Sequence, residues 1–401
     1  MALFMMNIEI LRQTAQEKSS RIIELRRQIH QYPELAYQEV RTAQLIQKEL
    51  QQLGVEVHSN YAETTAVIGV IHGEQSGPTR ALRADMDALS VQENTGLPFA
   101  SKIPGKMHAC GHDAHVAILL GAAHLLNQLH HELSGKIVLV FQPAEEGGGG
   151  GRKLVEYGLL EEFGIQAMFG HHVWSNLPEG CAYATRQGVL TSNSDAVFVE
   201  IVGKGAHGAR PNMGIDPVII ASHYVLACQE LISREIAPYD PAVITFGKLQ
   251  AGDTYNVISE KAKLEGTVRT QTFTTQDFLE KRLAEVLTGI TSAFRTTGTF
   301  KYVRNYPSVV NDPQLTAQVM IWAEEFWGKE QIATVSQPSM VGEDFAFYAR
   351  KIPACLGLLN SGSNEDLHNP RFTINEGILA SAAAWTTYVA VRSTEFLENL
   401  H

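Results

Sequence analysis

Several features are scarce in this sequence, and each scarcity removes a class of protein. The 401 residues contain only four cysteines, at the distant positions 110, 181, 228 and 355, which suggests a reducing compartment rather than a disulfide framework. No apolar run approaches the roughly 18 to 20 residues that a membrane span needs. Residues 1–6 lack the basic start and long apolar core of a signal peptide. We therefore expect a cytoplasmic protein with no membrane partner.

Clusters of basic residues are also lacking. The net charge is -11, and no group of lysines and arginines offers the positive face that nucleic acids require. We therefore expect no nucleic-acid partner, whereas a small-molecule substrate remains open. A hydrophobic content of 44% with 19% charged residues is typical of a globular protein, and this length predicts two domains, with three possible.

Helices and strands alternate in the first half of the chain. The spacing of apolar residues predicts two helices within residues 8–53, separated by Pro33. A helix over residues 113–131 follows, and the apolar runs 136–141 and 166–169 are typical of buried parallel strands. Polar residues follow the strand ends, which is where open α/β sheets form their sites. The prediction is an α/β domain with a mixed, mainly parallel sheet flanked by helices.

The pattern changes at about residue 188. It then predicts a strand, a helix, two strands, a helix and a strand, which is the order of a ferredoxin-like α+β domain. After about residue 306 the α/β pattern returns. The sequence therefore predicts a catalytic domain whose first part covers residues 1–187 and whose second part covers 307–401, with an inserted domain over 188–306.

The densest chemistry lies in residues 107–115, which hold three histidines, a thiol and a carboxylate. Cys110 and His112 can face one metal ion, because Gly111 allows the backbone between them to bend. Five ligands fit two ions better than one, and this mixture of donors suits zinc, manganese or cobalt without choosing among them. The candidate ligands, taken from loops and strand ends, are Cys110, His112, Glu146, His172 and His368.

Two adjacent carboxylates, Glu145 and Glu146, follow an apolar strand. On a regular strand they would face opposite sides, but the strand has ended and the glycine run 147–151 allows a turn. One carboxylate can then bind metal while the other takes a proton from water, as a general base does. The glycine run lacks the Gly-Lys-Ser/Thr pattern of a phosphate loop, so we expect a flexible turn.

Six motifs in this order resemble one enzyme family. They are RADMDAL (83–89), MHACGHD (107–113), FQPAEEG (141–147), HGARP (207–211), GEDF (342–345) and LHNP (367–370). Together they resemble the amidohydrolases that include hippurate hydrolase, indole-acetyl-amino-acid hydrolases and N-acyl-L-amino acid amidohydrolases. These enzymes belong to the wider aminoacylase and carboxypeptidase superfamily of dinuclear metallohydrolases.

The resemblance implies both an activity and individual roles. The activity is metal-dependent hydrolysis of linear amide bonds, which converts an N-acyl-L-amino acid to a carboxylic acid and a free amino acid. Two divalent ions would activate the attacking water, and Glu145 would be the general base. Asp87 would orient a metal ligand. The ions would be bound by the five candidate ligands given above.

The resemblance also implies a role for the inserted domain, which would be a lid that mediates homodimer formation. His207 would reach the substrate and stabilise the oxyanion, in related enzymes from the partner subunit. Asn256 would contact the substrate carboxylate. Arg269 would help there, although an arginine on a strand is equally consistent with a structural ion pair.

Three alternatives remain beside this interpretation. His171 directly precedes His172 and could be the ligand instead, but the motif favours His172 and strand alternation would put His171 on the opposite face. A dipeptidase or carboxypeptidase of the same superfamily is the alternative function. A catalytically silent metal-binding protein is disfavoured, because it would have no need of Glu145.

Overall fold

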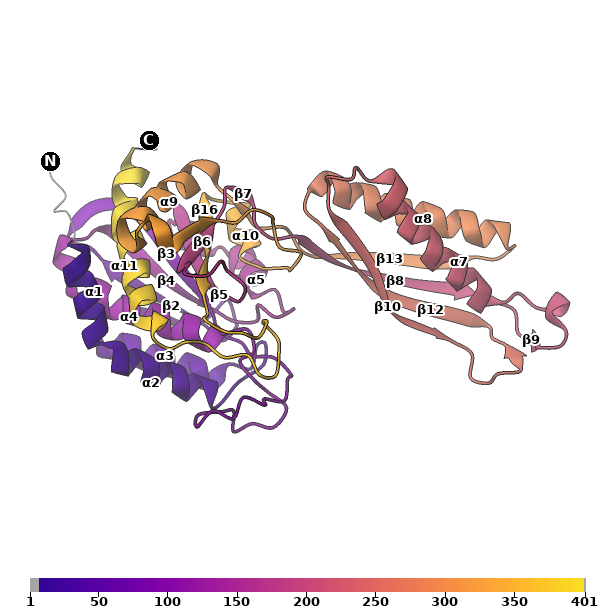
Figure 1. Ribbon diagram of the computed structural model, residues 1–401, viewed down its shortest axis with the longest axis horizontal. Coiled ribbons are helices and arrows are strands. Elements are labelled where there is room, and N and C mark those ends of the chain that lie inside the picture. Colours follow the sequence, from indigo (N-terminus) through magenta and orange to yellow (C-terminus); the bar gives the residue numbers. More distant parts are fainter. Residues whose placement is uncertain (1–6, 400–401) are drawn as a thin grey trace. The chain divides into compact units, whose positions relative to one another are not determined.

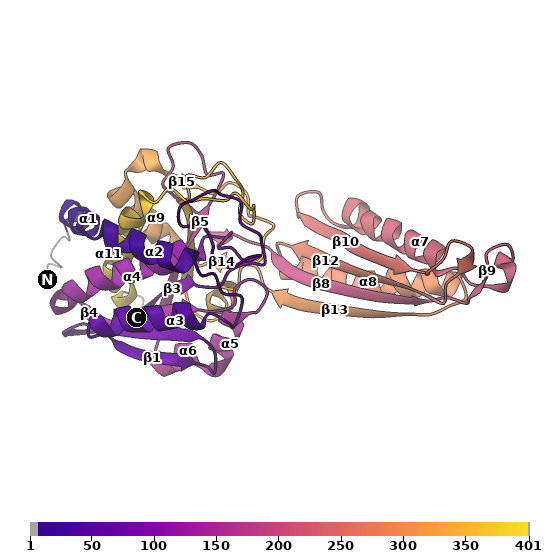
Figure 2. The ribbon, with the colours of Figure 1, turned by 90° about the horizontal axis from the view of Figure 1, so that it is seen from below.

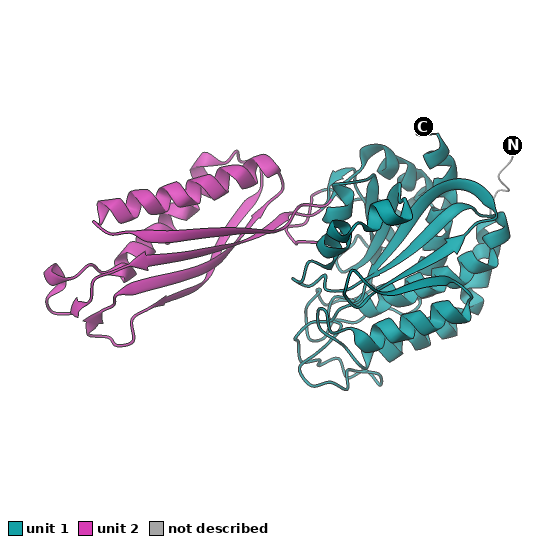
Figure 3. Ribbon diagram, turned by 180° about the vertical axis from the view of Figure 1, so that it is seen from behind, with its two compact units in different colours: residues 1–190, 310–336, 344–401 teal, residues 191–309, 337–343 magenta. Residues whose placement is uncertain are grey.

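The computed structural model describes residues 7–399, and the chain divides into two compact units (Figure 3). Unit 1 comprises residues 1–190, 310–336 and 344–401, and unit 2 comprises 191–309 and 337–343. Each unit has a hydrophobic core of its own. Residues 1–6, for which the sequence predicts no signal peptide, lie outside the described residues.

A sheet flanked by helices forms the centre of unit 1 (Figure 1). It has eight strands in the order β1-β2-β4-β3-β5-β16-β6-β15. Strands β4, β3, β5 and β16 are parallel neighbours, and β6 and β15 form another parallel pair. The pairings of β1 with β2, β2 with β4, and β16 with β6 are antiparallel. The strands are β1 (Glu56–Tyr61), β2 (Ala66–His72), β3 (Gln75–Asp85), β4 (Ser134–Gln142), β5 (Ala167–Trp174), β6 (Tyr183–Thr185), β15 (Ile332–Thr334) and β16 (Ala354–Asn360).

Helices flank this sheet and bury its central strands. Helices α4 and α11 pack against β3 and against each other, and α3 packs against β1 and β2. The predicted mixed, mainly parallel sheet flanked by helices is confirmed. The helices of unit 1 are α1 (Ile8–Glu17), α2 (Ser19–His30), α3 (Val40–Gln52), α4 (His112–Gln128), α5 (Gly150–Tyr157), α6 (Leu159–Phe163), α9 (Pro313–Trp327), α10 (Ala346–Ala349) and α11 (Ile378–Glu398).

The prediction of two helices over residues 8–53 is wrong, because the chain forms three. Helix α1 ends where the amide of Lys18 donates to the carbonyl of Ala15 at 3.0 Å. This bond spans three residues instead of the four of an α-helix, so the regular ladder stops there. Helix α2 then begins at Ser19. None of the helices between residues 7 and 399 is long and apolar enough to cross a membrane.

The predicted flexible turn over residues 147–151 is only partly right. Helix α5 already begins at Gly150, inside the glycine run. A Cβ atom at Gly150 would lie 1.7 Å from the carbonyl oxygen of Pro143, and one at Gly151 would lie 2.8 Å from that of Asp344. These glycines therefore allow backbone segments to approach closely.

Unit 2 contains a four-stranded antiparallel sheet in the order β10-β12-β8-β13. Helices α7 (Pro217–Glu230) and α8 (Phe273–Ala293) cover one face of this sheet (Figure 2). The short strands β9 (Ala206–His207) and β11 (Val257–Ile258) pair with each other. The four sheet strands are β8 (Asn193–Val202), β10 (Ala242–Ala251), β12 (Lys261–Thr270) and β13 (Gly298–Tyr306).

Candidate metal centre

Three parallel strands of unit 1 bring their carboxyl ends to one edge of the sheet. Strands β3 and β4 end together, with Asp85 paired to Gln142, and β5 runs parallel to β3 on its other side. Charged or imidazole side chains occupy or follow all three ends, among them Asp87, Glu145 and His172. This edge is where an open α/β sheet forms its site.

The loop before α4 approaches the same edge and bends at Gly111. This residue has a φ of +85°, and a Cβ there would lie 2.4 Å from Cγ2 of Val173 on β5. Both observations require glycine. The bend makes His112 the first residue of α4 and leaves Cys110 in the loop.

Cys110, Glu146 and His368 form a first group of donors, with one ligand atom of each within 4.8 Å of the others. Nε2 of His368 lies 3.3 Å from Oε1 of Glu146. Nε2 of His172 lies 3.5 Å from Sγ of Cys110, so His172 adjoins this group.

Glu146 also belongs to a second group, with His112 and Glu145. Nε2 of His112 lies 4.0 Å from Oε1 of Glu146. The structure therefore places all five candidate ligands in one cluster, with Glu145 beside them.

Several buried atoms of this cluster make no hydrogen bond. Both nitrogens of His112 and Oε1 of Glu146 are buried and make no hydrogen bond, whereas buried polar atoms ordinarily have a partner. Burial lowers the pKa of His112, but Asp85, Asp87 and Glu146 outweigh burial and raise it to about 10. A divalent cation would satisfy these atoms and the surrounding negative charge, so the residues fit a metal ion.

Cys110 and His172 differ in whether a metal ion would have to displace a proton from the ligand atom. Burial, followed by the charges of Glu146 and Glu145, raises the pKa of the Cys110 thiol well above its usual value. Burial lowers the pKa of His172 well below its usual value. Nδ1 of His172 donates to the carbonyl of Val173 at 2.6 Å, which leaves Nε2 for a metal. Cys110 must lose its proton on metal binding, whereas His172 is already neutral.

The carboxylate of Asp87 contacts all three residues of the second group, Glu145, Glu146 and His112. Its Oδ1 accepts from the amide of Glu145 at 2.9 Å, and its Oδ2 accepts from the amide of Glu146 at 3.0 Å. Oδ1 also lies 3.4 Å from Nδ1 of His112. One buried carboxylate thus fixes the backbone of both glutamates and lies beside the imidazole of His112. The preceding Ala144 has a φ of 57°, which makes the turn after β4.

His171 lies on the opposite face of β5, away from these donors. Its ring centroid is 5.9 Å from that of Tyr183 and 6.2 Å from that of Trp385. Burial lowers its pKa to about 3. The alternation of the strand therefore separates His171 from His172 in the way expected.

Unit 2 carries the three residues with expected substrate contacts and brings only two of them together. Val257 pairs with His207, and the amide of Gly208 donates to the carbonyl of Asn256 at 2.8 Å. His207 and Asn256 are exposed.

Arg269 lies elsewhere in unit 2. It pairs with Ser194 at the start of β8, whereas His207 follows the other end of that strand. Its guanidinium donates to Oγ1 of Thr267 and to the carbonyl of Val268. Burial lowers its pKa.

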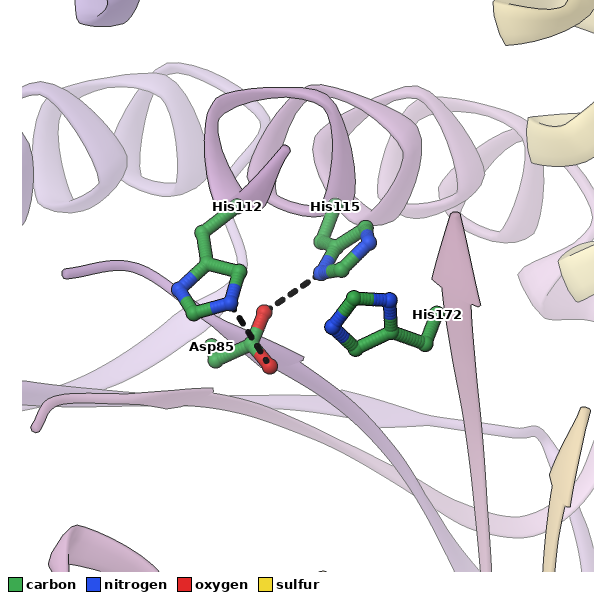
Figure 4. A group of neighbouring side chains, drawn as sticks. All are labelled: Asp85, His112, His115 and His172. Atoms are coloured by element: carbon green, nitrogen blue, oxygen red, sulfur yellow. Dashed lines mark hydrogen bonds and ion pairs between the residues drawn. The ribbon is translucent and has the colours of Figure 1, made fainter. Parts of the chain in front are cut away.

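Sequence reasoning missed a buried carboxylate and imidazole beside the cluster, Asp85 and His115 (Figure 4). Asp85 ends β3, and His115 follows His112 by three residues on α4, so both rings point from the same face of the helix. The spacing of the two histidines and the position of Asp85 at a strand end were the available signals.

Imidazole, thiolate and carboxylate donors at the carboxyl edge of an α/β sheet, with a further carboxylate beside them, are typical of metal-dependent hydrolases. Comparison with known proteins identifies the family. The model of Peptidase family M20/M25/M40 matches residues 81–391, which is more than half of the chain. The chain belongs to this family.

Three curated relatives cover most of the chain. An N-acetyl-L-cysteine deacetylase of Bacillus subtilis is 41% identical, over 90% of this chain and 85% of the relative. An IAA-amino acid hydrolase of Arabidopsis thaliana is 40% identical, over 92% and 85%. A thermostable carboxypeptidase of Saccharolobus solfataricus is 37% identical, over 96% and 98%. The predicted resemblance is confirmed.

A solved structure agrees with these relatives. The crystal structure of a dinuclear metal binding peptidase of the M20 family from Bacillus subtilis superposes with a TM-score of 0.83 and 36% identity, and covers 95% of this chain and 99% of that chain. The protein is therefore a hydrolase that cleaves amide bonds with divalent metal, as predicted.

Proposed function

We propose that the protein cleaves N-acyl-L-amino acids into a carboxylic acid and a free amino acid, with Glu145 as the general base. The observation that carries this proposal is the position of Glu145, which is buried beside His112 and Glu146. Asp87 holds its backbone, so the carboxylate is fixed next to the donors without being one of the five. The similarity to a deacetylase and to an IAA-amino acid hydrolase supports an acyl substrate.

The proposed cofactor is a pair of divalent ions, with zinc, manganese and cobalt all suited to the donors. When bound, such ions polarise a carbonyl group and lower the pKa of water. The residues that would hold them are Cys110, His112, Glu146, His172 and His368.

The chain's own residues would then move one proton and stabilise one charge. Glu145 takes a proton from the attacking water and returns it to the leaving nitrogen. His207 donates a hydrogen bond to the oxyanion that develops on the former carbonyl oxygen. Asn256, which adjoins His207 in unit 2, contacts the substrate carboxylate. Arg269 is the weaker candidate for this contact, because it lies at the other end of the sheet of unit 2.

The proposal also includes an assembly and a location. Unit 2 would serve as a lid and join two copies of the chain into a homodimer, as the family resemblance suggests. The scattered cysteines favour the cytoplasm. Size-exclusion chromatography with light scattering would test the dimer, and a monomeric active enzyme would contradict it.

A carboxypeptidase is the second candidate function, because a relative with 37% identity carries that name. The two functions differ in the group on the amino side of the scissile bond. An aminoacylase accepts a simple acyl group, whereas a dipeptidase or carboxypeptidase requires an amino acid there.

The test is the release of free amino acid from N-acetyl, N-benzoyl and indole-acetyl amino acids, beside plain dipeptides. Metal-stripped enzyme would be assayed alone and after addition of zinc, manganese or cobalt. We expect hydrolysis of the acyl substrates that depends on metal. If only the dipeptides were hydrolysed, the protein would be a peptidase and the proposal would be wrong. If metal were bound but no substrate hydrolysed, the protein would be a catalytically silent metal-binding protein.

A further inference from the structure

His115 uses both ring nitrogens, although it is not among the candidate metal ligands. Figure 4 shows the contact of one of these nitrogens with Asp85. Nδ1 of His115 lies 2.5 Å from Oδ1 of Asp85. Its Nε2 accepts a hydrogen bond from the backbone amide of Val173 at 2.8 Å. A backbone amide can only donate, so Nε2 carries no proton and Nδ1 donates to the carboxylate. The two hydrogen bonds therefore favour a single tautomer of the ring.

Asp85, His112, His115 and His172 lie close enough to suggest a metal site of their own, with one ligand atom of each within 4.8 Å of the others. The hydrogen bonds argue against that interpretation. Oδ1 of Asp85 accepts from His115, and Oδ2 accepts from Arg83 at 2.7 Å. His115 has no nitrogen left for an ion.

Only His112 and His172 have a nitrogen left in this group. Nδ1 of His172 is engaged by a backbone carbonyl, so its Nε2 is the atom that remains. Both histidines already belong to the proposed metal centre. The other two residues therefore support that centre and do not form a second one.

Both backbone groups of Val173 hold a histidine. Its amide donates to His115, and its carbonyl accepts from His172. The rings of His115 and His172 are also in edge-to-face contact, with centroids 4.6 Å apart. A displacement of His115 would therefore shift the backbone that orients His172.

We propose that His115 is a positioning residue, which ties the end of β5 to Asp85 and thereby fixes Nε2 of His172 for a metal ion. Asp85 is held in turn by Arg83. The guanidinium of Arg83 donates to Oδ2 of Asp85 at 2.7 Å and to Oδ1 of Asp344 at 2.8 Å. All of these groups are buried, so no side chain in the chain of contacts can move into solvent. The inference rests on the proposed metal centre.

The first experiment measures zinc affinity by competition with a chromophoric chelator. His115→Phe removes both contacts, and we expect a 10- to 100-fold loss of affinity, as for other residues that orient metal ligands. His115→Gln keeps an oxygen that can accept from the amide of Val173, so we expect a smaller loss. His171→Phe, on the opposite face of the same strand, is the matched control and should bind zinc as the wild type does.

The number of ions bound distinguishes positioning from ligation. A positioning role leaves two ions per chain at saturating zinc in every variant, and it changes the absorption spectrum of the cobalt-loaded His115→Phe protein. If His115 were a ligand, His115→Gln and His115→Phe would lose an ion alike, and the proposal would be overturned. Unchanged affinity in both variants would also overturn it.

A second measurement uses the metal-free wild type and needs no variant to fold. Imidazole ¹⁵N chemical shifts should show His115 protonated on Nδ1 alone, and the amide of Val173 should be protected from hydrogen exchange. Protonation on Nε2 would contradict the inference whatever the metal results. A wild type that binds no divalent ion would overturn the metal centre itself, whereas normal binding with unaffected variants would overturn only the role of His115.

Discussion

Unit 1 buries ion pairs in its interior, whereas unit 2 keeps them at its surface. Arg26 and Asp113 are 1% and 0% exposed and lie 3.0 Å apart, and Arg83 and Asp85 are equally buried at 2.7 Å. The seven ion pairs found within residues 191–309 of unit 2 all have side chains at least 30% exposed. Within residues 191–309, the buried carboxylate of Asp195 accepts hydrogen bonds from the neutral side chains of Gln276 and Tyr302.

This difference shows which unit is organised around chemistry. Burying a charge costs free energy unless its partners are well placed, and a buried ion pair is weak evidence of stability alone. These two buried pairs of unit 1 adjoin the donor cluster, since Asp113 follows His112 and Asp85 contacts His115. The interior of unit 1 is therefore arranged for the site, and that of unit 2 for packing.

The largest expected effect is the loss of turnover in Glu145→Gln. The variant keeps the shape of the side chain but not its ability to take a proton, so kcat should fall by about 10²- to 10⁴-fold. Bound metal, measured by mass spectrometry of the ions, should stay at the wild-type level. A fully active variant would remove Glu145 from its proposed role.

Asp113→Asn should give the largest loss of stability. It removes the buried carboxylate that pairs with both Arg26 and His30, while Arg26 keeps its contact with the more exposed Glu376 at 3.1 Å. Removing one member of a buried ion pair costs about 3–5 kcal/mol. Urea unfolding of the metal-free protein can follow unit 1 alone, because all four tryptophans, Trp174, Trp322, Trp327 and Trp385, lie in that unit. A change below 1 kcal/mol would contradict the view that the interior of unit 1 depends on paired charges.

The stability of unit 1 should also depend on the protonation of His30. Burial lowers its pKa, but Asp113 and Glu93 outweigh burial and raise the pKa to about 9. The raised pKa stabilises the fold fully below pH 6.5, and this contribution disappears as the pH rises through 9. The difference in unfolding free energy between wild type and His30→Gln should therefore shrink by about 3 kcal/mol over that range. A difference that does not change with pH would contradict the assignment.

Metal binding should strengthen as the pH rises. The Cys110 thiol, with its raised pKa, and His112, with a pKa of about 10, both carry protons that an ion must displace at neutral pH. Affinity should therefore increase by about 10- to 100-fold per pH unit between pH 6 and 8. Calorimetry in buffers of different ionisation enthalpy would count the protons released, and release of none would contradict these pKa shifts.

The smallest effect is expected in unit 2. Lys263 and Glu200 lie 3.4 Å apart with side chains 52% and 40% exposed, and exposed pairs of this kind contribute about 0.2–1 kcal/mol. Glu200→Gln should therefore change the unfolding free energy by less than 1 kcal/mol, as monitored by circular dichroism. A loss of unfolding free energy as large as that of Asp113→Asn would contradict the difference between buried ion pairs in unit 1 and exposed ion pairs in unit 2.

Local patterns predicted part of this molecule well. The apolar run that became β4 indicated a buried strand next to parallel neighbours, and the mixed sheet is confirmed. The glycine between Cys110 and His112 indicated the bend that φ at Gly111 shows. Strand alternation separated His171 from His172 without any tertiary information. The assignment of the five ligands and of Glu145 stays a prediction.

Contacts between distant residues could not be predicted in this way. Arg26 and Asp113 are 87 positions apart, and Asp85 and His115 are 30 apart. The spacing of apolar residues along the sequence does not indicate which buried charged residues pair with each other. The break between α1 and α2 was missed for a different reason, since it rests on one shortened hydrogen bond at Lys18 in an otherwise helical pattern. The glycines at the start of α5 reflect close backbone approach, which composition does not distinguish from flexibility.

The discontinuity of unit 1 has a consequence for biosynthesis. Strand β16 lies between β5 and β6 in the sheet, but it follows all of residues 191–309 in the chain. At a synthesis rate of about 5–20 residues per second, β5 waits on the order of 10 to 40 s for its neighbour. Unit 2 can fold on the ribosome during this interval, while the half-built sheet exposes an unpaired parallel edge that chaperones would need to protect. His368 emerges later still, so the proposed metal centre can be completed only after β16 and the loop that follows it have been synthesised.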